Sequence, residues 1–178
     1  MDPVAVAIGR GALALLFGIA AMHKARDLDR FAATLAEYRL LPAVASGVAA
    51  RIVPALELAA AFALSTPALH TAGPLLAGAL LFVYTGAIGT NLARGRRDID
   101  CGCAGPAVRQ SLSGSLVARN AMLLVVALAC LAPVRPRPLG AIDALTVAAA
   151  VAALAMLYAA IERMLANLPA VGRLRSAA

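Results

Sequence analysis

The stretch LAAAFALSTPALHTAGPLLAGALLFVYTGAIGTNLA, residues 58–93, contains no Asp, Glu, Lys or Arg. A helix that crosses a bilayer needs about 20 mainly apolar residues. Residues 71–92 meet this requirement most clearly, and residues 65–70, which include Pro67, predict a tight turn before them. The stretch therefore predicts a membrane-spanning helix that follows the end of another across a short turn.

The composition of the whole chain agrees with a membrane protein. Hydrophobic residues make up 62% of its 178 residues and charged residues 14%, whereas soluble domains have about 45–50% apolar and about 25% charged residues. This composition excludes an ordinary cytosolic enzyme, a disordered tail and a secreted disulfide scaffold. We expect an all-α integral membrane protein, a single transmembrane domain over residues 1–178 that forms a compact bundle of about five helices. The expected spans are about residues 4–22, 47–64, 71–92, 116–132 and 141–161, and residues 23–42 are expected to form a connecting loop.

The net charge of +7 is interpreted as an orientation signal. In a soluble protein it would favour nucleic-acid binding, but no basic run is interleaved with aromatic residues, so no nucleic-acid partner is expected. The expected spans put Arg10, Arg135 and Arg137 on one side and thirteen basic residues on the other. The positive-inside rule makes the second side cytoplasmic and puts the N-terminus outside. The thirteen residues are Lys24, Arg26, Arg30, Arg39, Arg51, Arg94, Arg96, Arg97, Arg109, Arg119, Arg163, Arg173 and Arg175.

Cys101-Gly102-Cys103 is the sharpest chemical feature of the sequence. Two thiols separated by one residue can close a small ring, and Gly102 tolerates the tight turn because it has no Cβ atom. A strained, accessible disulfide tends to be oxidising and labile, so it exchanges rather than acting as a structural link. The motif predicts thiol–disulfide exchange, and two unrelated loop thiols are the alternative.

The remaining cysteine does not suggest a metal site. Closed zinc sites take four ligands. Apart from the cysteine pair, the Cys and His residues of the chain are Cys130, His23 and His70, so no metal is expected. Cys130 lies about 20 Å along the fourth expected span, near the opposite membrane face from the cysteine pair. We expect it to be a small packing residue.

Glu57 is the second chemical feature, because an ionisable residue inside a span is costly and marks a candidate functional site. It follows Pro54 by three residues, and the proline removes one backbone donor from the helix. Glu57 is predicted to accept or donate a proton in the thiol chemistry, and the structural alternative is a Glu paired with a neighbouring donor or Arg. Four supporting residues fall toward the same end of the bundle as Glu57 and the cysteine pair: His23, Lys24, Arg119 and Asn120.

Several short motifs occur together in the chain: Met22-His23-Lys24 with Phe31, Tyr38-Arg39-Leu40-Leu41-Pro42, Pro54-x-x-Glu57, Asp100-Cys-Gly-Cys103 with Gly105, and Arg119-Asn120. Together they resemble the MauE family of methylamine utilisation proteins, which is related to the DoxX-like membrane proteins. The resemblance covers roughly residues 10–130. Its specific part is the Cys-Gly-Cys motif with the downstream Arg-Asn pair.

The resemblance implies a helper protein of the bacterial inner membrane. It would carry out thiol–disulfide exchange with a thioredoxin-like partner of the MauD type, in maturation of a periplasmic disulfide-rich client, the small subunit of an amine dehydrogenase. It would be one component of a thiol–disulfide oxidoreductase system rather than a stand-alone enzyme. Because the chain has one cysteine pair and one remote thiol, a complete electron relay would need a quinone, a partner protein or a second subunit.

Three other functions and a question of orientation stay open at this point. The alternatives are a non-redox transporter, a structural membrane subunit and a quinone-linked, DoxX-like oxidoreductase subunit. The charge distribution puts Cys101 and Cys103 on the cytoplasmic side, whereas the implied client is periplasmic. Either the donor is cytoplasmic, or the site is reached through the bundle, or the orientation is inverted.

Overall fold

A computed structural model describes residues 1–97, 99, 112–135 and 137–175, and all regular structure in this part of the chain is helical. The expected all-α membrane class is confirmed. In chain order the elements are α1 (Pro3–Ala25), α2 (Leu28–Tyr38), α3 (Ala43–Ser65), the 3-10 helix η1 (Pro67–Leu69), α4 (Ala72–Ala93), α5 (Gly114–Ala129) and α6 (Ala141–Arg175).

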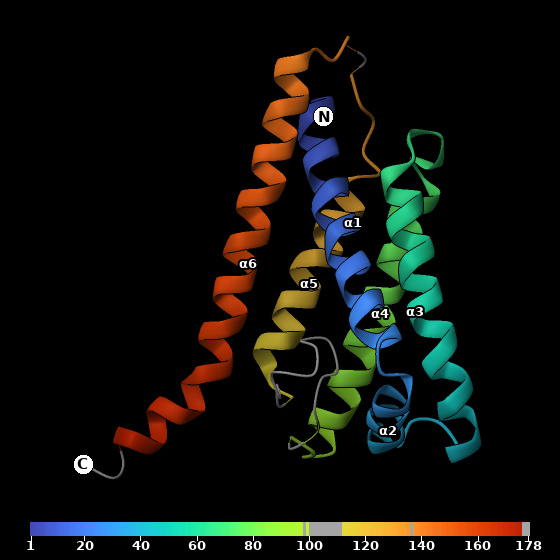
Figure 1. Ribbon diagram of the computed structural model, residues 1–178, viewed down its shortest axis with the longest axis vertical. Coiled ribbons are helices and arrows are strands. Elements are labelled where there is room, and N and C mark those ends of the chain that lie inside the picture. The colour runs from blue at the N-terminus through green and yellow to red at the C-terminus, as the bar shows by residue number, and fades with distance from the viewer. Residues whose placement is uncertain (98, 100–111, 136, 176–178) are drawn as a thin grey trace.

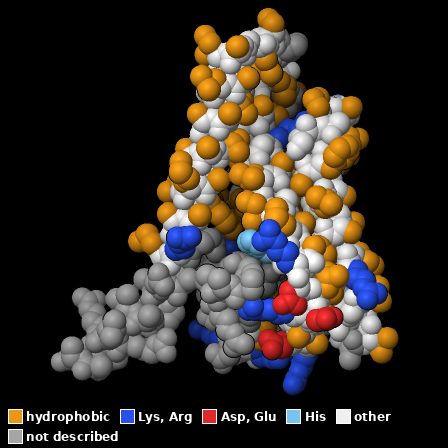
Figure 2. All heavy atoms as spheres, viewed as in Figure 1, with side chains coloured by type: hydrophobic (Ala, Val, Ile, Leu, Met, Phe, Trp, Pro, Cys, Tyr) orange, Lys and Arg blue, Asp and Glu red, His pale blue; other side chains and the backbone are white. Residues whose placement is uncertain are grey.

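The long helices run alternately up and down along one axis (Figure 1). Helix α1 packs against α3 and α6, and α4 packs against α3 and α5. The short helix α2 lies at one end of the bundle, together with the C-terminal ends of α1 and α4 and the N-terminal ends of α3 and α5 (Figure 1). We call this the α2 end. Figure 2 shows hydrophobic side chains along the bundle and charged side chains gathered at the α2 end.

Four helices of the described chain are long and apolar enough to cross a membrane: α1, α4, and the segments Val44–Ser65 of α3 and Ala141–Ile161 of α6. Helix α5 overlaps the fourth expected span but is shifted toward the N-terminus: its 16 residues begin at Gly114 rather than at residue 116 and end at Ala129 rather than at residue 132. Pro133 follows four residues later, and because it lacks an N–H group and its ring crowds the Ala129 carbonyl group, it favours the end of the helix here. Helix α6 continues well beyond the fifth expected span, as far as Arg175.

The expected loop over residues 23–42 contains the helix α2. Its N-cap residue is Asp27, whose carboxylate accepts a hydrogen bond from the Arg30 amide at 3.0 Å. Phe31, Thr34 and Tyr38 recur at helical spacing and are buried. This pattern is typical of an amphipathic helix that lies on a bundle, and 11 residues are too few to span a bilayer.

Small residues let the helices approach closely, as is usual where lipid supplies no hydrophobic drive for their association. Ala60, Ala77 and Ala127 are fully buried in the core formed by α1, α3, α4 and α5. At the α3–α4 turn a Cβ atom on Gly73 would lie 2.7 Å from the backbone nitrogen of Leu64. Only glycine allows this approach.

Arg10 interrupts the first apolar segment, and the structure gives it a structural role. Its Nε donates to Leu64 O at 2.9 Å, and its Nη2 donates to Ala63 O at 3.3 Å and to Thr66 O at 2.8 Å. The last carbonyl groups of a helix have no partner within the helix. Arg10 therefore caps the C-terminal end of α3 from α1.

Candidate functional site

A buried ion pair joins α1 to α3 near the α2 end. Lys24 lies in the last turn of α1, and its Nζ is 2.5 Å from Glu57 Oε1. Lys24 is 4% exposed and Glu57 is 1% exposed. Because removing an ion from water costs several kcal/mol even after relaxation, a pair so deeply buried needs further polar contacts.

Two aromatic residues supply contacts to this pair. The hydroxyl group of Tyr84 on α4 donates to Glu57 Oε1 at 2.7 Å. The Nζ atom of Lys24 lies 5.5 Å from the ring centroids of both Tyr84 and Phe31, close enough for cation–π attraction. Phe31 comes from α2 and is itself buried. Residues from α1, α2, α3 and α4 thus meet at one buried polar cluster: Lys24, Phe31, Glu57 and Tyr84.

Helix α3 brings Glu57 to this cluster without a break at Pro54. The helix is continuous from Ala43 to Ser65 with the proline inside it. Pro54 has no N–H group to donate to the carbonyl of Ala50, four residues earlier. Ala50 and Ala60, on either side of the proline, are both buried. The packing of neighbouring helices around them therefore holds α3 in place here.

The structure brings together two of the predicted site residues, Lys24 and Glu57, and it shows Glu57 paired, which was the structural alternative. Arg119 and Asn120 contact each other on α5, where Arg119 Nε and Nη2 lie 3.3 and 3.2 Å from Asn120 Oδ1. Arg119 also lies 6.0 Å from the ring centroid of Tyr158 on α6. In the described part of the chain, His23 Nδ1 and Asn120 Nδ2 are buried and make no hydrogen bond.

Cys101 and Cys103 lie outside the described residues. The residues that flank this segment on either side are joined at the α2 end. Leu112 N donates to Arg97 O at 3.0 Å and to Ile99 O at 3.2 Å. The chain therefore returns, after the segment that carries the cysteine motif, to the point from which it left α4.

Cys130 packs against α1 near the opposite end of the bundle. It is 7% exposed, and its Sγ lies 4.0 Å from Val6 O. A Cβ atom on Gly9 would come within 3.0 Å of this sulfur. Val6 and Lys24 are separated by 18 residues of α1, about 27 Å. Among the described residues, no three His, Cys, Asp or Glu side chains are grouped so that they could hold a metal ion.

Sequence reasoning did not single out a second polar contact, between α4 and α2. Asn91 is fully buried, and its amide donates to Ala87 O at 3.1 Å. Arg96 Nη1 donates to Asn91 Oδ1 at 3.2 Å and to Tyr38 O at 3.4 Å. Asn91, a polar residue near the end of an otherwise apolar span, could have indicated this contact from the sequence. Tyr84 could have indicated the first cluster in the same way.

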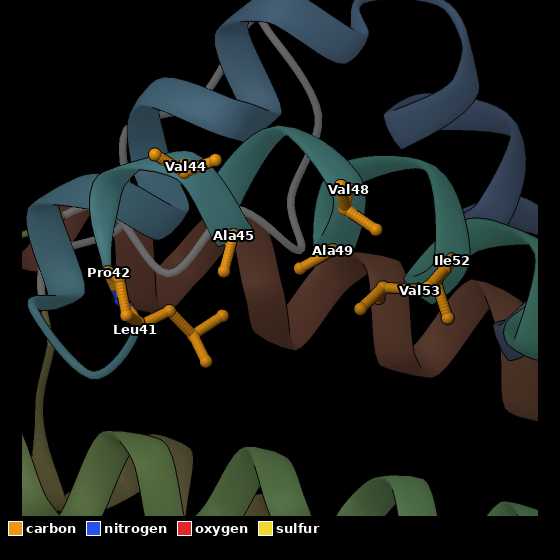
Figure 3. A pocket seen from close by; sticks show the side chains of 8 residues that line it. All are labelled: Leu41, Pro42, Val44, Ala45, Val48, Ala49, Ile52 and Val53. Carbon is orange, nitrogen blue, oxygen red and sulfur yellow. The ribbon is translucent and has the colours of Figure 1, made fainter.

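The surface also carries an apolar groove on α3 at the α2 end, which we call the α3 groove. It is lined by Leu41, Pro42 and one face of α3 that includes Val44, Val48, Ala49 and Ile52. Figure 3 shows these side chains along successive turns of the helix. Val44 is 89% exposed, so the groove faces outward from the bundle.

The fold and the site together define a small multi-pass helical membrane protein with a buried ion pair near one end. A family model described as methylamine utilisation protein MauE matches residues 2–133. The chain belongs to this family, whose members are involved in methylamine utilisation.

Relatives named methylamine utilization protein MauE support this membership. The protein of Paracoccus versutus is 42% identical over 163 residues, which cover 90% of this chain and 87% of the relative. The protein of Methylophilus methylotrophus is 33% identical over 169 residues, covering 92% and 87%. The protein of Paracoccus denitrificans is 41% identical over 117 residues, covering 66% of this chain but only 63% of the relative. No solved structure matches the chain.

Proposed function

We propose that this chain is a membrane-embedded thiol–disulfide helper in methylamine utilisation, in which Cys101 and Cys103 exchange electrons with a thioredoxin-like partner. The observation that carries the proposal is the Cys-Gly-Cys motif between α4 and α5. The flanks of this segment, Arg97 and Leu112, are hydrogen-bonded at the α2 end, the end at which α1 carries Lys24. Membership of the MauE family supports a role in methylamine utilisation.

The exchange proceeds by two thiolate attacks. A thiolate of the reduced partner attacks the Cys101–Cys103 disulfide, forms a mixed disulfide and releases the other sulfur as a thiolate. A second partner thiolate then attacks the mixed disulfide, so that the partner leaves as a disulfide and this chain is left with two thiolates, which take up two protons to become thiols. Two electrons pass to this chain, and an acceptor, a quinone or a second thiol protein, must remove them before the next cycle.

In this proposal Glu57 takes part as the proton acceptor when the reduced pair is reoxidised, a step in which one of the two thiols of this chain must first become a thiolate. Removing the charge of one member of a buried pair leaves the other uncompensated, which is costly. Transfer of a proton from a thiol to Glu57 leaves the net charge of the site unchanged, because a thiolate appears as the carboxylate disappears. The Lys24 ammonium can then pair with the thiolate, and His23, Arg119 and Asn120 are proposed as supporting residues.

We also propose the setting of this activity. The chain would lie in the bacterial inner membrane with its N-terminus outside, since thirteen of its 16 basic residues fall on the other side. Its client would be a periplasmic protein rich in disulfides, such as the small subunit of an amine dehydrogenase. Because this orientation puts the flanks of the cysteine segment on the cytoplasmic side, the pair would act on that client either with a cytoplasmic electron donor or along a path through the bundle.

Trapping of the mixed disulfide tests the proposal. Cys103→Ser or Cys101→Ser, expressed as the full chain in cells that grow on methylamine, should accumulate a disulfide-linked adduct with the partner. Cys130→Ser is the matched control and should accumulate none, because Cys130 is buried at the far end of the bundle. If neither variant traps an adduct and both support growth like the unaltered chain, the exchange function is wrong.

A structural membrane subunit is the second candidate, and the buried cluster favours it. Lys24 and Glu57 have polar and aromatic partners within the bundle, as a purely structural pair would require. If the chain is a structural subunit, cells with the double variant Cys101→Ser/Cys103→Ser would keep full growth on methylamine. The same result is expected for a transporter or for a quinone-linked DoxX-like subunit that does not use the thiols.

A further inference from the structure

Arg51 is a cation on the outer face of a membrane-spanning helix. It lies eight residues after the start of α3, about 12 Å along the helix. Its side chain is exposed, and it has no hydrogen-bond or ion-pair partner in the part of the chain that the structure describes. An ionisable side chain at such a position in a span is costly unless it finds an anion.

Arg51 does not itself line the α3 groove, but it lies next to lining residues of the groove on the helix. Val44 and Val48 line the groove and lie seven and three residues before Arg51, which puts all three residues on one stripe of the helix. Long helical side chains lean toward the N-terminus of their helix. A guanidinium that follows this tendency would reach back beside the groove toward the α2 end and the polar membrane surface.

The charges around the groove favour an anion at this position. Arg39 is exposed at the corner between α2 and α3, and the first amides of α3 have no side-chain cap. A helix N-terminus carries a partial positive charge. The lining of the groove below this point is apolar, with Val48 57% and Ile52 51% exposed. A ligand that fits both parts has an anionic head and a hydrocarbon tail.

We propose that the α3 groove binds one anionic phospholipid, with its phosphate paired to Arg51 and one acyl chain along Val44, Val48 and Ile52. The bilayer around a membrane-spanning α3 supplies such lipids directly. The site does not depend on the cysteine chemistry. From this proposal we expect the groove to prefer a lipid whose headgroup has a net negative charge over a zwitterionic lipid with the same acyl chains.

Lipid retention tests this site. The full chain is reconstituted into vesicles with equal amounts of phosphatidylglycerol and phosphatidylethanolamine of matched acyl chains. It is then extracted in mild detergent, and the lipids that remain bound are measured by native mass spectrometry. We expect retained phosphatidylglycerol, reduced about fivefold by Arg51→Gln and restored by Arg51→Lys. Arg94→Gln, which removes the same charge from an exposed residue at the end of α4, should leave retention unchanged.

Two results would overturn the proposal. Equal retention by Arg51→Gln and Arg94→Gln would mean that only the overall charge of the chain attracts the lipid. A groove-filling Ala49→Phe variant that keeps full retention would show that no acyl chain lies there. Arg51 is exposed and Ala49 is half-buried on α3. Elution of the Arg51→Gln and Ala49→Phe variants as single species in size-exclusion chromatography checks that the bundle is intact.

Discussion

At the scale of single residues, the Lys24–Glu57 pair makes the strongest prediction about stability. Loss of one partner from a buried ion pair costs about 3–5 kcal/mol, because the remaining charge is left uncompensated. We expect Glu57→Gln and Lys24→Met each to lower the free energy of unfolding in mixed micelles by about this amount. The double variant should lose much less than the sum, and a fully additive result would show that the two charges do not interact.

Tyr84→Phe separates the hydrogen bond from the aromatic contact. The substitution removes the hydroxyl that donates to Glu57 Oε1 and keeps the ring 5.5 Å from Lys24 Nζ. A hydrogen bond to a charged group contributes about 1.5–3 kcal/mol, so the unfolding free energy should fall by about that amount. Tyr84→Leu removes the ring as well and should destabilise further. Equal values for the two variants would exclude a cation–π contribution.

Sequence reasoning reached Glu57 and Lys24 for different reasons. Ionisable residues are rare within spans, so Glu57 stood out by itself. Lys24 stood out only because it closes a helix at the same end. Tyr84 did not, because the target of a hydroxyl depends on how α4 is rotated against α3, and periodicity within an apolar helix does not determine that rotation.

At the scale of elements, the sequence predicted the long apolar helices better than the segments between them. The hydrophobic stretches of α1, α3 and α4 are nearly uncharged, so their lengths follow from composition. Helix α2 was missed because its residues are mixed in charge. Its signal is the spacing of Phe31, Thr34 and Tyr38 after the capping residue Asp27, which shows only when the segment is treated as amphipathic.

The contact between α3 and α4 can be tested with two glycines of α4. At Gly73 a new Cβ atom would meet backbone atoms of α3 at 2.7–2.9 Å, whereas at Gly86 nothing lies within 4 Å. We expect Gly73→Ala to destabilise the bundle by about 1–3 kcal/mol, the usual cost of overpacking. Gly86→Ala should be neutral or stabilise by up to about 1 kcal/mol, because alanine is the better helix former. Thermal unfolding in detergent compares the two, and an equal loss for both would contradict the close approach.

At the scale of the whole molecule, the uneven distribution of basic residues predicts the orientation. In a background with Cys101, Cys103 and Cys130 replaced by Ser, single cysteines are introduced as Arg39→Cys at the α2 end and Arg135→Cys at the opposite end. We expect a membrane-impermeant maleimide to label Arg135→Cys from outside intact cells. Arg39→Cys should react only after the membrane is opened, and the reverse pattern would invert the proposed topology.

The cap that Arg10 forms on α3 has a consequence for biosynthesis. The carbonyl group of Leu64 that Arg10 binds is translated 54 residues after it. A guanidinium at the centre of an inserting helix costs about 2.5–3.5 kcal/mol, and Arg10, seven residues after the start of α1, carries part of this cost. We therefore expect the nascent α1 to stay at the insertion machinery until α3 emerges, so that the two helices enter the lipid together. Photo-crosslinks from α1 to that machinery should persist in truncated chains that stop before Thr66, and should end early in an Arg10→Leu variant.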